Sequence, residues 1–241
     1  MHEAIVVIPT FNEIENIEPI IRAVFSLENK FDILVVDDNS PDGTASKVRE
    51  LQSIYSDRLH LEVRNEKSGL GTAYIHGFKW CLERNYNYIF EMDADFSHNP
   101  KDLNRLFLKC QQPEIDMVIG SRYVKGVNVV NWPLSRVLLS YLASIYVRVI
   151  TGMRIYDTTA GFVCYRREVL EAIDLDEIKF IGYAFQIEMK FKAYLKKFKI
   201  VEIPIVFTDR VRGESKLSGN IIYEAVFGVI KMRLKSLFGR E

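Results

Sequence analysis

The segment "YIFEMDADFSHNP" (residues 88–100) joins an apolar run to a cluster of polar side chains. Its start is typical of a buried strand, and Pro100 is typical of the beginning of a helix. Side chains at positions i and i+2 of a strand point the same way, so Asp93 and Asp95 face one point if the strand continues to its end. Two carboxylates so close together repel each other and need a counter-charge. A divalent cation is the obvious candidate.

On either side of this segment, apolar runs alternate with stretches of helical periodicity. We expect strands at 4–9, 32–38, 59–65, 88–95 and 116–123, and helices within 10–27, 44–55 and 71–85. This alternation predicts an α/β fold with a mostly parallel central sheet flanked by helices. Ligands bind such a sheet beyond the carboxyl ends of its strands. The segments that should share that edge are "PTFNE", "VVDDNS", "MDADFS" and "GSRY".

The second half of the chain has a less regular pattern. We expect helices at 135–153, 185–197 and 220–240, strands at 162–167 and 200–207, and a polar turn at 157–162. The apolar run at 137–153 is shorter than the about 20 residues of a bilayer span and contains Arg148, so we do not expect it to cross a membrane. The last helix is amphipathic and basic near its end, so it either packs on the domain or lies at a membrane interface.

The composition indicates one large folded domain. Hydrophobic residues make up 48% and charged residues 27% of the 241 residues. Lys and Arg number 32, as do Asp and Glu, so net charge gives no reason to expect a nucleic acid partner, and any attraction to a membrane must be local. The three cysteines form no CxxC pair and read as reduced thiols of a cytosolic protein. We expect no signal peptide, because the first residues lack a basic region followed by a long apolar stretch.

Several common chemistries are excluded by missing motifs. The first strand is followed by "PTFNE" and not by G-x-G-x-x-G, and "SGLGTA" (68–73) is only a lone GxG before a helix. There is no Walker loop, no zinc spacing among the four histidines, and no G-x-S-x-G elbow. Hydride transfer, ATP hydrolysis and serine hydrolysis are therefore not expected.

Acidic and cationic side chains together form a candidate diphosphate site. Arginine binds phosphate oxygens bidentately, and lysine acts as a point charge. The cations are Arg122 after the strand at 116–123 and, in the loop "DRVRGESK", Arg210, Arg212 and Lys216. Each cation is also compatible with a surface ion pair, and the acid pair with a solvated strand end or a helix cap. In "VVDDNS" we expect Asp38 to face the ligand and Asp37 to support the structure.

The order of these segments resembles that of the dolichol-phosphate mannosyltransferases, family 2 glycosyltransferases with a GT-A fold. The similarity runs from residue 5 to about 220. It is carried by "PTFNE", "VVDDNSPDGT", "GLGTAY", "MDADFSHNP", "GSRY", "DTTAGF", "YRREVL", "GYAFQIEM" and "RVRGESKL". The D-x-D and "VVDD" segments are shared widely across that superfamily. "DTTAGF" with "RVRGESKL" is narrower and points to polyprenyl-phosphate acceptors.

This resemblance implies roles for individual residues. The metal, Mg²⁺ or Mn²⁺, would be bound by Asp93 and Asp95 with Ser97 nearby, and Ala94 would lie against the donor. The nucleoside would be held by Pro9, Phe11, Glu13, Val36 and Asp38, and the phosphates by Arg122, Arg210 and Lys216. Phe11 stands where many relatives have Tyr, and Ser97 stands where some have Gln. Asp157 would either order the acceptor side or cap a turn.

The implied reaction is inverting transfer of mannose from GDP-mannose to dolichyl or another polyprenyl phosphate, at the cytosolic face of a membrane. An acceptor phosphate needs no general base, because its second pKa lies near 6. Residues 1–218 would form the catalytic domain and 219–241 an amphipathic basic helix. Small membrane-embedded subunits are compatible with this interpretation. The alternatives are a UDP-sugar-dependent enzyme that transfers glucose or N-acetylglucosamine to polyprenyl phosphate, sugar transfer to a glycan hydroxyl, and a nucleotide-binding module without turnover.

Overall fold

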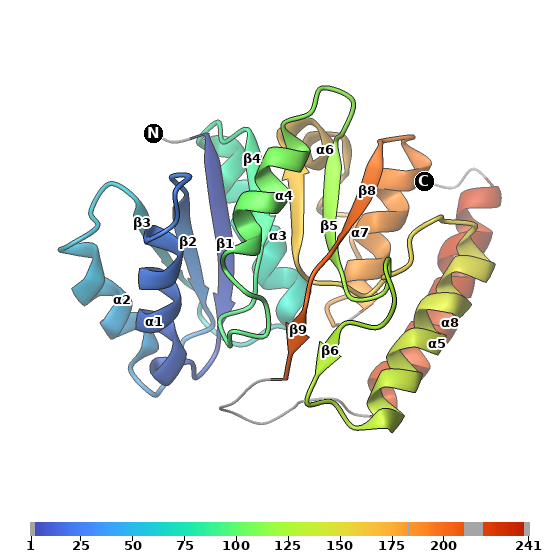
Figure 1. Cartoon of the computed structure of the whole chain (residues 1–241), viewed down its shortest axis with the longest axis horizontal. Coiled ribbons are helices and arrows are strands. Elements are labelled where there is room, and N and C mark those ends of the chain that lie inside the picture. The colour runs from blue at the N-terminus through green and yellow to red at the C-terminus, as the bar shows by residue number, and fades with distance from the viewer. Residues whose placement is uncertain (1–2, 183, 210–218, 239–241) are drawn as a thin grey trace.

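The computed structural model describes residues 3–182, 184–209 and 219–238 (Figure 1). The strands are β1 (Ala4–Thr10), β2 (Asp32–Asp37), β3 (Leu59–Val63), β4 (Tyr88–Glu91), β5 (Met117–Ser121), β6 (Val129–Val130), β7 (Val163–Arg166), β8 (Ile200–Pro204) and β9 (Phe207–Thr208). The helices are α1 (Ile14–Phe25), α2 (Thr44–Gln52), α3 (Leu70–Glu83), α4 (Asp102–Cys110), α5 (Leu134–Thr151), α6 (Arg167–Ala172), α7 (Ala184–Leu195) and α8 (Gly219–Leu237).

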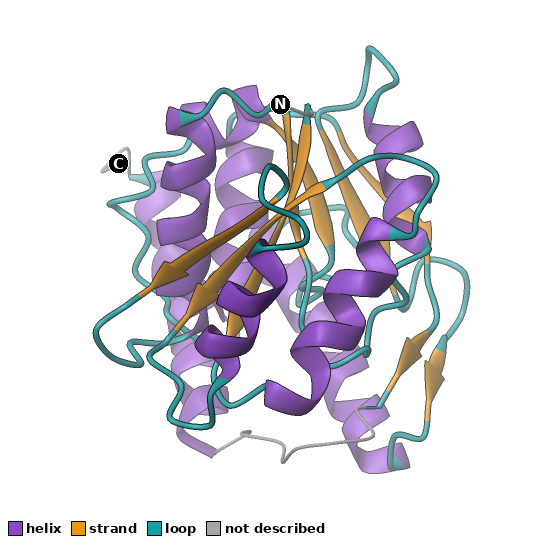
Figure 2. Cartoon of the chain, turned by 90° about the vertical axis from the view of Figure 1, so that its left-hand side faces the viewer, coloured by secondary structure: helices purple, strands orange, loops and turns teal. Residues whose placement is uncertain are grey.

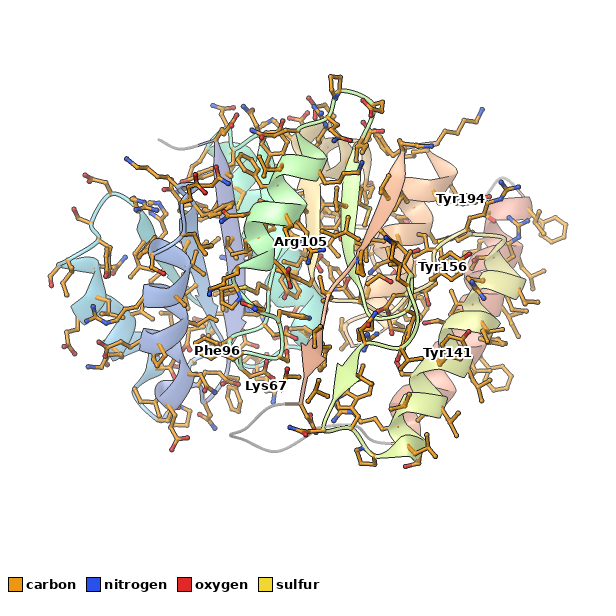
Figure 3. The ribbon with its side chains drawn as sticks, viewed as in Figure 1. Lys67, Phe96, Arg105, Tyr141, Tyr156 and Tyr194 are labelled. Atoms are coloured by element: carbon orange, nitrogen blue, oxygen red, sulfur yellow. The ribbon has the colours of Figure 1, made fainter. Side chains whose placement is uncertain are left out.

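The described strands form a larger sheet in the order β3-β2-β1-β4-β7-β5-β8, and β6 pairs with β9 in a separate two-stranded sheet. In the larger sheet only β7 is antiparallel to its neighbours, β4 and β5. This confirms the predicted mostly parallel sheet. Helices cover both faces of the sheet (Figure 2). The carboxyl ends of β1, β2 and β4 therefore lie at one edge, where Lys67 and Phe96 are seen in Figure 3.

The core has one apolar layer on each face of the larger sheet. In β1, Ile5 and Val7 pack in the layer with α3, α6 and α7, whereas Val6 and Ile8 pack in the layer with α1, α2 and α4. Because both faces are buried, the parallel strands read as continuous apolar runs. Helix α3 lies very close to β1, since a Cβ on Gly77 would come within 2.5 Å of a Val7 methyl group.

The fourth strand ends earlier than predicted. β4 stops at Glu91, so the expectation of a strand to residue 95 was wrong, and i, i+2 alternation does not explain the orientation of the acid pair. The Asp95 carboxylate accepts a hydrogen bond from the Ser97 N–H at 3.0 Å, and Phe96 has a left-handed φ of 59°. This local turn keeps residues 95–97 out of the strand, because an Asp side chain can replace a ladder hydrogen bond.

The strand predicted at 200–207 is two strands. β8 ends at Pro204, which has no N–H for a ladder, and β9 begins at Phe207 in the small sheet. There Phe207 pairs in register with Val129, next to the loop that enters α5. The side chain of Phe207 thereby reaches the carboxyl edge of the larger sheet.

Helix α5 is the one described helix that is long and apolar enough to cross a membrane by length and composition alone. It begins at Leu134, before the predicted start, and only 17% of its 18 residues are buried. The expectation that this segment does not cross a membrane, which rested on its length and on Arg148, stays a prediction.

Helix α8 packs against α5 and α7 (Figure 1). The Tyr146 hydroxyl of α5 donates a hydrogen bond to the Val226 carbonyl of α8 at 2.8 Å. This helix was expected either to pack on the domain or to lie at a membrane interface. Its described residues pack on the domain.

Candidate active site

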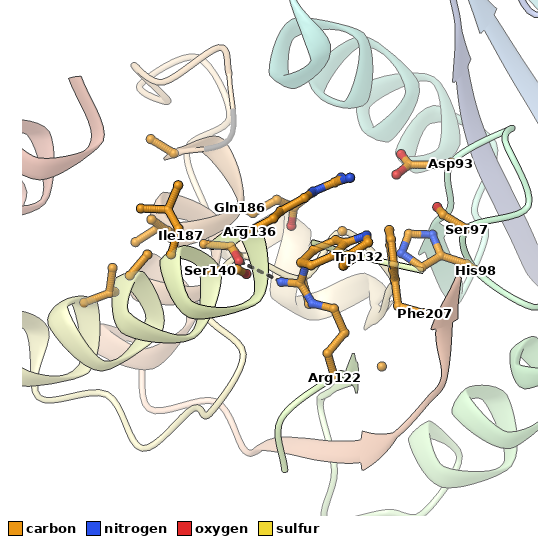
Figure 4. Close-up of a pocket in the computed structure, with 18 of the residues that line it drawn as sticks. Asp93, Ser97, His98, Arg122, Trp132, Arg136, Ser140, Gln186, Ile187 and Phe207 are labelled. Atoms are coloured by element: carbon orange, nitrogen blue, oxygen red, sulfur yellow. Dashed lines mark hydrogen bonds between the residues drawn. The ribbon is translucent and has the colours of Figure 1, made fainter. Parts of the chain in front are cut away.

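A cavity of about 340 Å³ lies beyond the carboxyl ends of β4 and β5 (Figure 4). Its wall combines the loop after β4, the end of β5, residues 136–147 of α5, the turn before β7 and the start of α7. The residues with chemical groups on this wall include Asp93, Asp95, Ser97, Arg122, Arg136 and Gln186. Segments far apart in the sequence are thus brought to one space.

The acid pair lies on this wall although it does not lie on a strand. The hydroxyl of Tyr74, buried in α3, is 3.5 Å from the Asp93 carboxylate. Beside the pair, the buried Ser97 Oγ has no hydrogen-bond partner within the described part of the chain. No cluster of three His, Cys, Asp or Glu that suits a metal occurs among the described residues. Two carboxylates and a hydroxyl nevertheless fit Mg²⁺ or Mn²⁺, which take their remaining oxygens from substrate phosphates and water.

Arg122 is held by Asp157 in a buried ion pair. The guanidinium donates to both Asp157 oxygens at 2.7 and 2.6 Å, and the Arg122 backbone N–H donates to the same carboxylate at 2.9 Å. Burial acts to raise the pKa of Asp157, but Arg122 outweighs it and keeps that pKa below its usual value. Arg122 also donates to Thr159 Oγ1 at 2.8 Å. The Asp157 carboxylate thus orients Arg122 at the cavity wall.

An aromatic wall carries groups to which sequence patterns assign no role. His98 stacks on Phe162 with ring centroids 4.8 Å apart, and burial lowers the pKa of His98 to about 4, so its ring is neutral. Arg136 lies over the Trp132 ring at 4.1 Å, pairs with Asp209 at 2.9 Å, and points toward Asp93 in Figure 4. Within the described residues, His98 Nδ1 and Trp132 Nε1 are buried without partners. Unpaired buried donors and acceptors at a cavity wall suit a polar ligand.

The predicted nucleoside-binding residues lie at the ends of β1 and β2 and do not line this cavity. Pro9 and Val36 are register partners in the sheet, and the side chain of Val36 is buried in the core. Asp38 is paired with Arg64 through two hydrogen bonds of 2.7 and 2.8 Å. Burial raises the pKa of Asp38, and Arg64 opposes that shift.

The two strand ends are tied together by side chains. The Glu13 N–H donates to Thr44 Oγ1 at 3.0 Å, and Asp37 accepts hydrogen bonds from Thr10 and Ser40. Lys67 lies 4.2 Å from the centroid of the Phe11 ring. Ala94 is buried beside the acid pair. Arg210, Arg212 and Lys216 lie outside the described residues.

Beneath the cavity, a buried polar network joins β4 to α7. Gln186 donates to Glu91, and Lys190 Nζ donates to the Gln186 side chain at 3.0 Å and to the Ala160 carbonyl at 2.6 Å. Burial raises the pKa of Glu91 and lowers that of Lys190. The Tyr165 hydroxyl supplies Glu91 with a further donor at 3.0 Å. This network holds Gln186 and the turn before β7 in place from the core side of the cavity wall.

Comparison with known proteins places the chain among sugar-transferring enzymes. Residues 5–174 match the model of the family described as glycosyl transferase family 2. The chain is 47% identical over 236 residues to polyprenol monophosphomannose synthase of Mycolicibacterium smegmatis, covering 98% of this chain and 89% of that protein. It is 45% identical over 228 residues to undecaprenyl-phosphate mannosyltransferase of Micrococcus luteus, covering 95% and 93%.

Solved structures show the same fold at low sequence identity. Glucosyl-3-phosphoglycerate synthase from Mycobacterium tuberculosis, in complex with Mn²⁺, UDP-glucose and phosphoglyceric acid, has a TM-score of 0.67 and 17% identity over 98% of this chain and 79% of that one. A mannosyltransferase from Pyrobaculum calidifontis, in complex with GDP-mannose and Mn²⁺, has a TM-score of 0.59 and 17% identity over 98% and 74%. These likenesses confirm the predicted GT-A fold.

Proposed function

The chain belongs to glycosyl transferase family 2, and from this membership we propose that it transfers mannose from GDP-mannose to the phosphate of a polyprenyl phosphate. The names of the two relatives support mannose as the sugar and a polyprenyl phosphate as the acceptor. The observation that carries the proposal is the meeting of Asp93 and Asp95 with Arg122 on one cavity wall that continues into the apolar residues of α5. Such a site suits a diphosphate at one end and a lipid at the other.

A divalent metal, Mg²⁺ or Mn²⁺, would be held by Asp93 and Asp95, with Ser97 Oγ beside them. When bound, it supplies positive charge that stabilises the departing nucleoside diphosphate. Arg122 and Arg136 present guanidinium groups on the same wall, each held in place by an aspartate, Asp157 and Asp209 respectively. Fixed charges in a partly buried site stabilise a developing negative charge without reorganisation of solvent. Arg210 and Lys216 stay predicted phosphate-binding residues.

The acceptor explains why no catalytic base is needed. A phosphate monoester has a second pKa near 6 and is mostly a nucleophilic dianion at neutral pH. Its oxygen attacks the anomeric carbon as the bond to the diphosphate breaks, so the configuration inverts. The acceptor dianion carries no proton that His98 would have to remove. The neutral ring of His98 forms part of the cavity wall.

The acceptor tail has an apolar path out of the site. Leu139, Leu142 and Ala143 of α5 line the cavity, and Leu134 and Val149 on the same helix are 71% and 74% exposed. We place this helix at a bilayer surface, at the cytosolic face, with the lipid reaching the cavity along it. The division into a catalytic domain at 1–218 and a helix at 219–241 belongs to this proposal, and accessory membrane subunits stay a prediction.

The test incubates purified protein and Mn²⁺ with a short polyprenyl phosphate and, separately, with GDP-mannose, UDP-glucose or UDP-N-acetylglucosamine. Mannolipid formed from GDP-mannose alone supports the proposal. Product formed only from a UDP-sugar would contradict GDP-mannose as the donor and would favour a UDP-sugar-dependent enzyme. Binding of nucleotide without any product contradicts catalysis and leaves a nucleotide-binding module.

A further inference from the structure

A second cavity, of about 850 Å³, lies between α7, α8 and the segment 174–180. Among the described residues it shares no lining residue with the candidate active site. Its shape depends on direct packing of α8 on Phe180, because a Cβ on Gly228 would lie 2.4 Å from the Phe180 ring. The volume is in the range of small-ligand sites, and the cavity is about half open to solvent.

The pocket carries more lysines than carboxylates able to neutralise them. The described lining residues include five lysines, Lys179, Lys192, Lys196, Lys231 and Lys235, and three acids, Asp174, Glu177 and Glu188. Glu188 is buried and accepts the backbone N–H groups of Lys179 and Phe180 at 2.9 and 3.0 Å, so it is part of the scaffold. The lysines come from three separate elements that folding brings together.

Lys179, Lys231 and Lys235 all line this one cavity, two of them one turn apart on α8. Lys179 is the largest cause that lowers the pKa of Lys235, desolvation and then Lys231 add to it, and Glu177 opposes the shift. Like charges gathered at one pocket raise the local concentration of anions. A bound anion would relieve this repulsion.

Apolar surface lies directly beside the charged groups. Phe180, Phe191, Leu195, Phe227 and Met232 also line the pocket. Phe227, Ile230, Leu234 and Leu237 recur at helical spacing on α8 and are 54%, 37%, 49% and 60% exposed. The fitting ligand therefore has an anionic head and an apolar tail.

We propose that this pocket binds the phosphate headgroup of an anionic phospholipid of the bilayer through Lys179, Lys231 and Lys235, while the acyl chains contact the exposed stripe of α8. The site anchors and orients the protein on acidic membranes and is separate from the place where sugar is transferred. It rests on the proposed function only in placing the protein at a bilayer.

The test measures binding of the full chain to phosphatidylcholine vesicles with and without phosphatidylglycerol, by cosedimentation at fixed ionic strength. The variant is Lys179→Gln with Lys231→Gln and Lys235→Gln. Its matched control is Lys30→Gln with Lys101→Gln and Lys125→Gln, three exposed lysines on other elements with the same change in charge. We expect the pocket variant to bind phosphatidylglycerol vesicles at least about 10-fold more weakly, and the control variant to bind as the parent does.

Equal loss in both variants would mean that only total charge matters and would overturn the proposal. Equal binding of the parent protein to both vesicle types would overturn it as well. Sugar transfer is measured separately in detergent with a short acceptor, where the pocket variant should retain the parent rate because its lysines lie outside the active-site cavity. Failure of transfer by the parent protein contradicts the proposed function and leaves the vesicle result standing.

Discussion

At the scale of single residues, the site depends on charges whose orientation is set by neighbours. Asp157 is fully buried and binds Arg122 through both carboxylate oxygens. A pair of this kind contributes little net stability, but removal of one partner leaves a buried charge uncompensated. The Asp95 carboxylate, in contrast, makes a local turn with Ser97 and faces the cavity.

We expect Asp157→Asn to lower the free energy of unfolding by about 3 kcal/mol or more at pH 7. The pKa of Asp157 is depressed in the folded state, so its contribution is present above the unfolded pKa and is lost as the pH falls through the folded pKa. The difference in unfolding free energy between the parent and the variant should therefore become smaller below about pH 4. Urea unfolding followed by circular dichroism at pH 7, 5 and 3 measures this difference. A constant difference would contradict the pairing.

We expect Asp95→Asn to lower turnover by at least about 100-fold and to weaken Mn²⁺ binding, because it removes a negative charge at the proposed metal site. Asn still accepts the hydrogen bond from the Ser97 N–H, so the thermal midpoint should stay near that of the parent. Turnover and Mn²⁺ titration by electron paramagnetic resonance provide the readouts. Asp57→Asn, at an exposed position, is the control. Normal metal binding by the Asp95 variant would exclude this carboxylate as a ligand.

At the scale of elements, β4 and α7 are joined by buried polar groups as well as by apolar packing. Glu91 and Lys190 have no exposed surface, and Gln186 connects them. Lys190 also holds the turn before β7 through the Ala160 carbonyl. A strand beneath the site and a helix beside it thus share one network.

A double-mutant cycle tests whether the network acts as a unit. Lys190→Met alone should cost about 3–5 kcal/mol of unfolding free energy, because Glu91 loses its buried counter-charge and must take up a proton, and the Ala160 carbonyl loses its donor. Glu91→Met combined with Lys190→Met should cost less than the sum of the single variants, with a coupling of about 1 kcal/mol or more. Additive costs, measured by urea unfolding at pH 7, would show that the two charges do not interact.

At the scale of the whole molecule, the cavity at the carboxyl edge of the sheet and the exposed helix α5 lie next to each other. Residues of α5 line the active-site cavity, while others on the same helix are exposed to solvent. A contiguous exposed apolar face of this kind marks an interaction surface. Its proximity to the cavity suits an enzyme whose acceptor is anchored in lipid.

We expect Leu138→Ser combined with Val149→Ser to lower transfer to a long-chain acceptor in vesicles by about 10-fold or more, because two exposed apolar contacts with the bilayer are lost. Leu138 and Val149 are 50% and 74% exposed, so stability should change by less than about 1 kcal/mol. Transfer to a short acceptor in detergent should not change. Leu108→Ser, at a 59% exposed position of α4, is the control. A parallel loss on both acceptors would contradict a membrane role.

The strands β1, β2, β4 and β5 were predictable because each is an apolar run that is buried on both faces of the sheet. Their ends were not, because they depend on local turns such as the one at Asp95 and Phe96. The antiparallel pairing of β7 and the pairing of β6 with β9 join segments distant in sequence, and no local pattern specifies them. Trp132 and Arg136 lie just after β6 and at the start of α5, and they reach the cavity only through this packing, so sequence patterns assign them no role.

The sequence by itself determined the fold class, since apolar periodicity is local, and it brought two candidate metal-binding carboxylates, Asp93 and Asp95, within three positions. Only the tertiary structure decided which side chains share the cavity with Asp93 and Asp95, and that Asp157 orients Arg122. The reason is physical: a charge is oriented by whichever groups surround it after folding, and those groups come from strands, turns and helices separated by tens of residues.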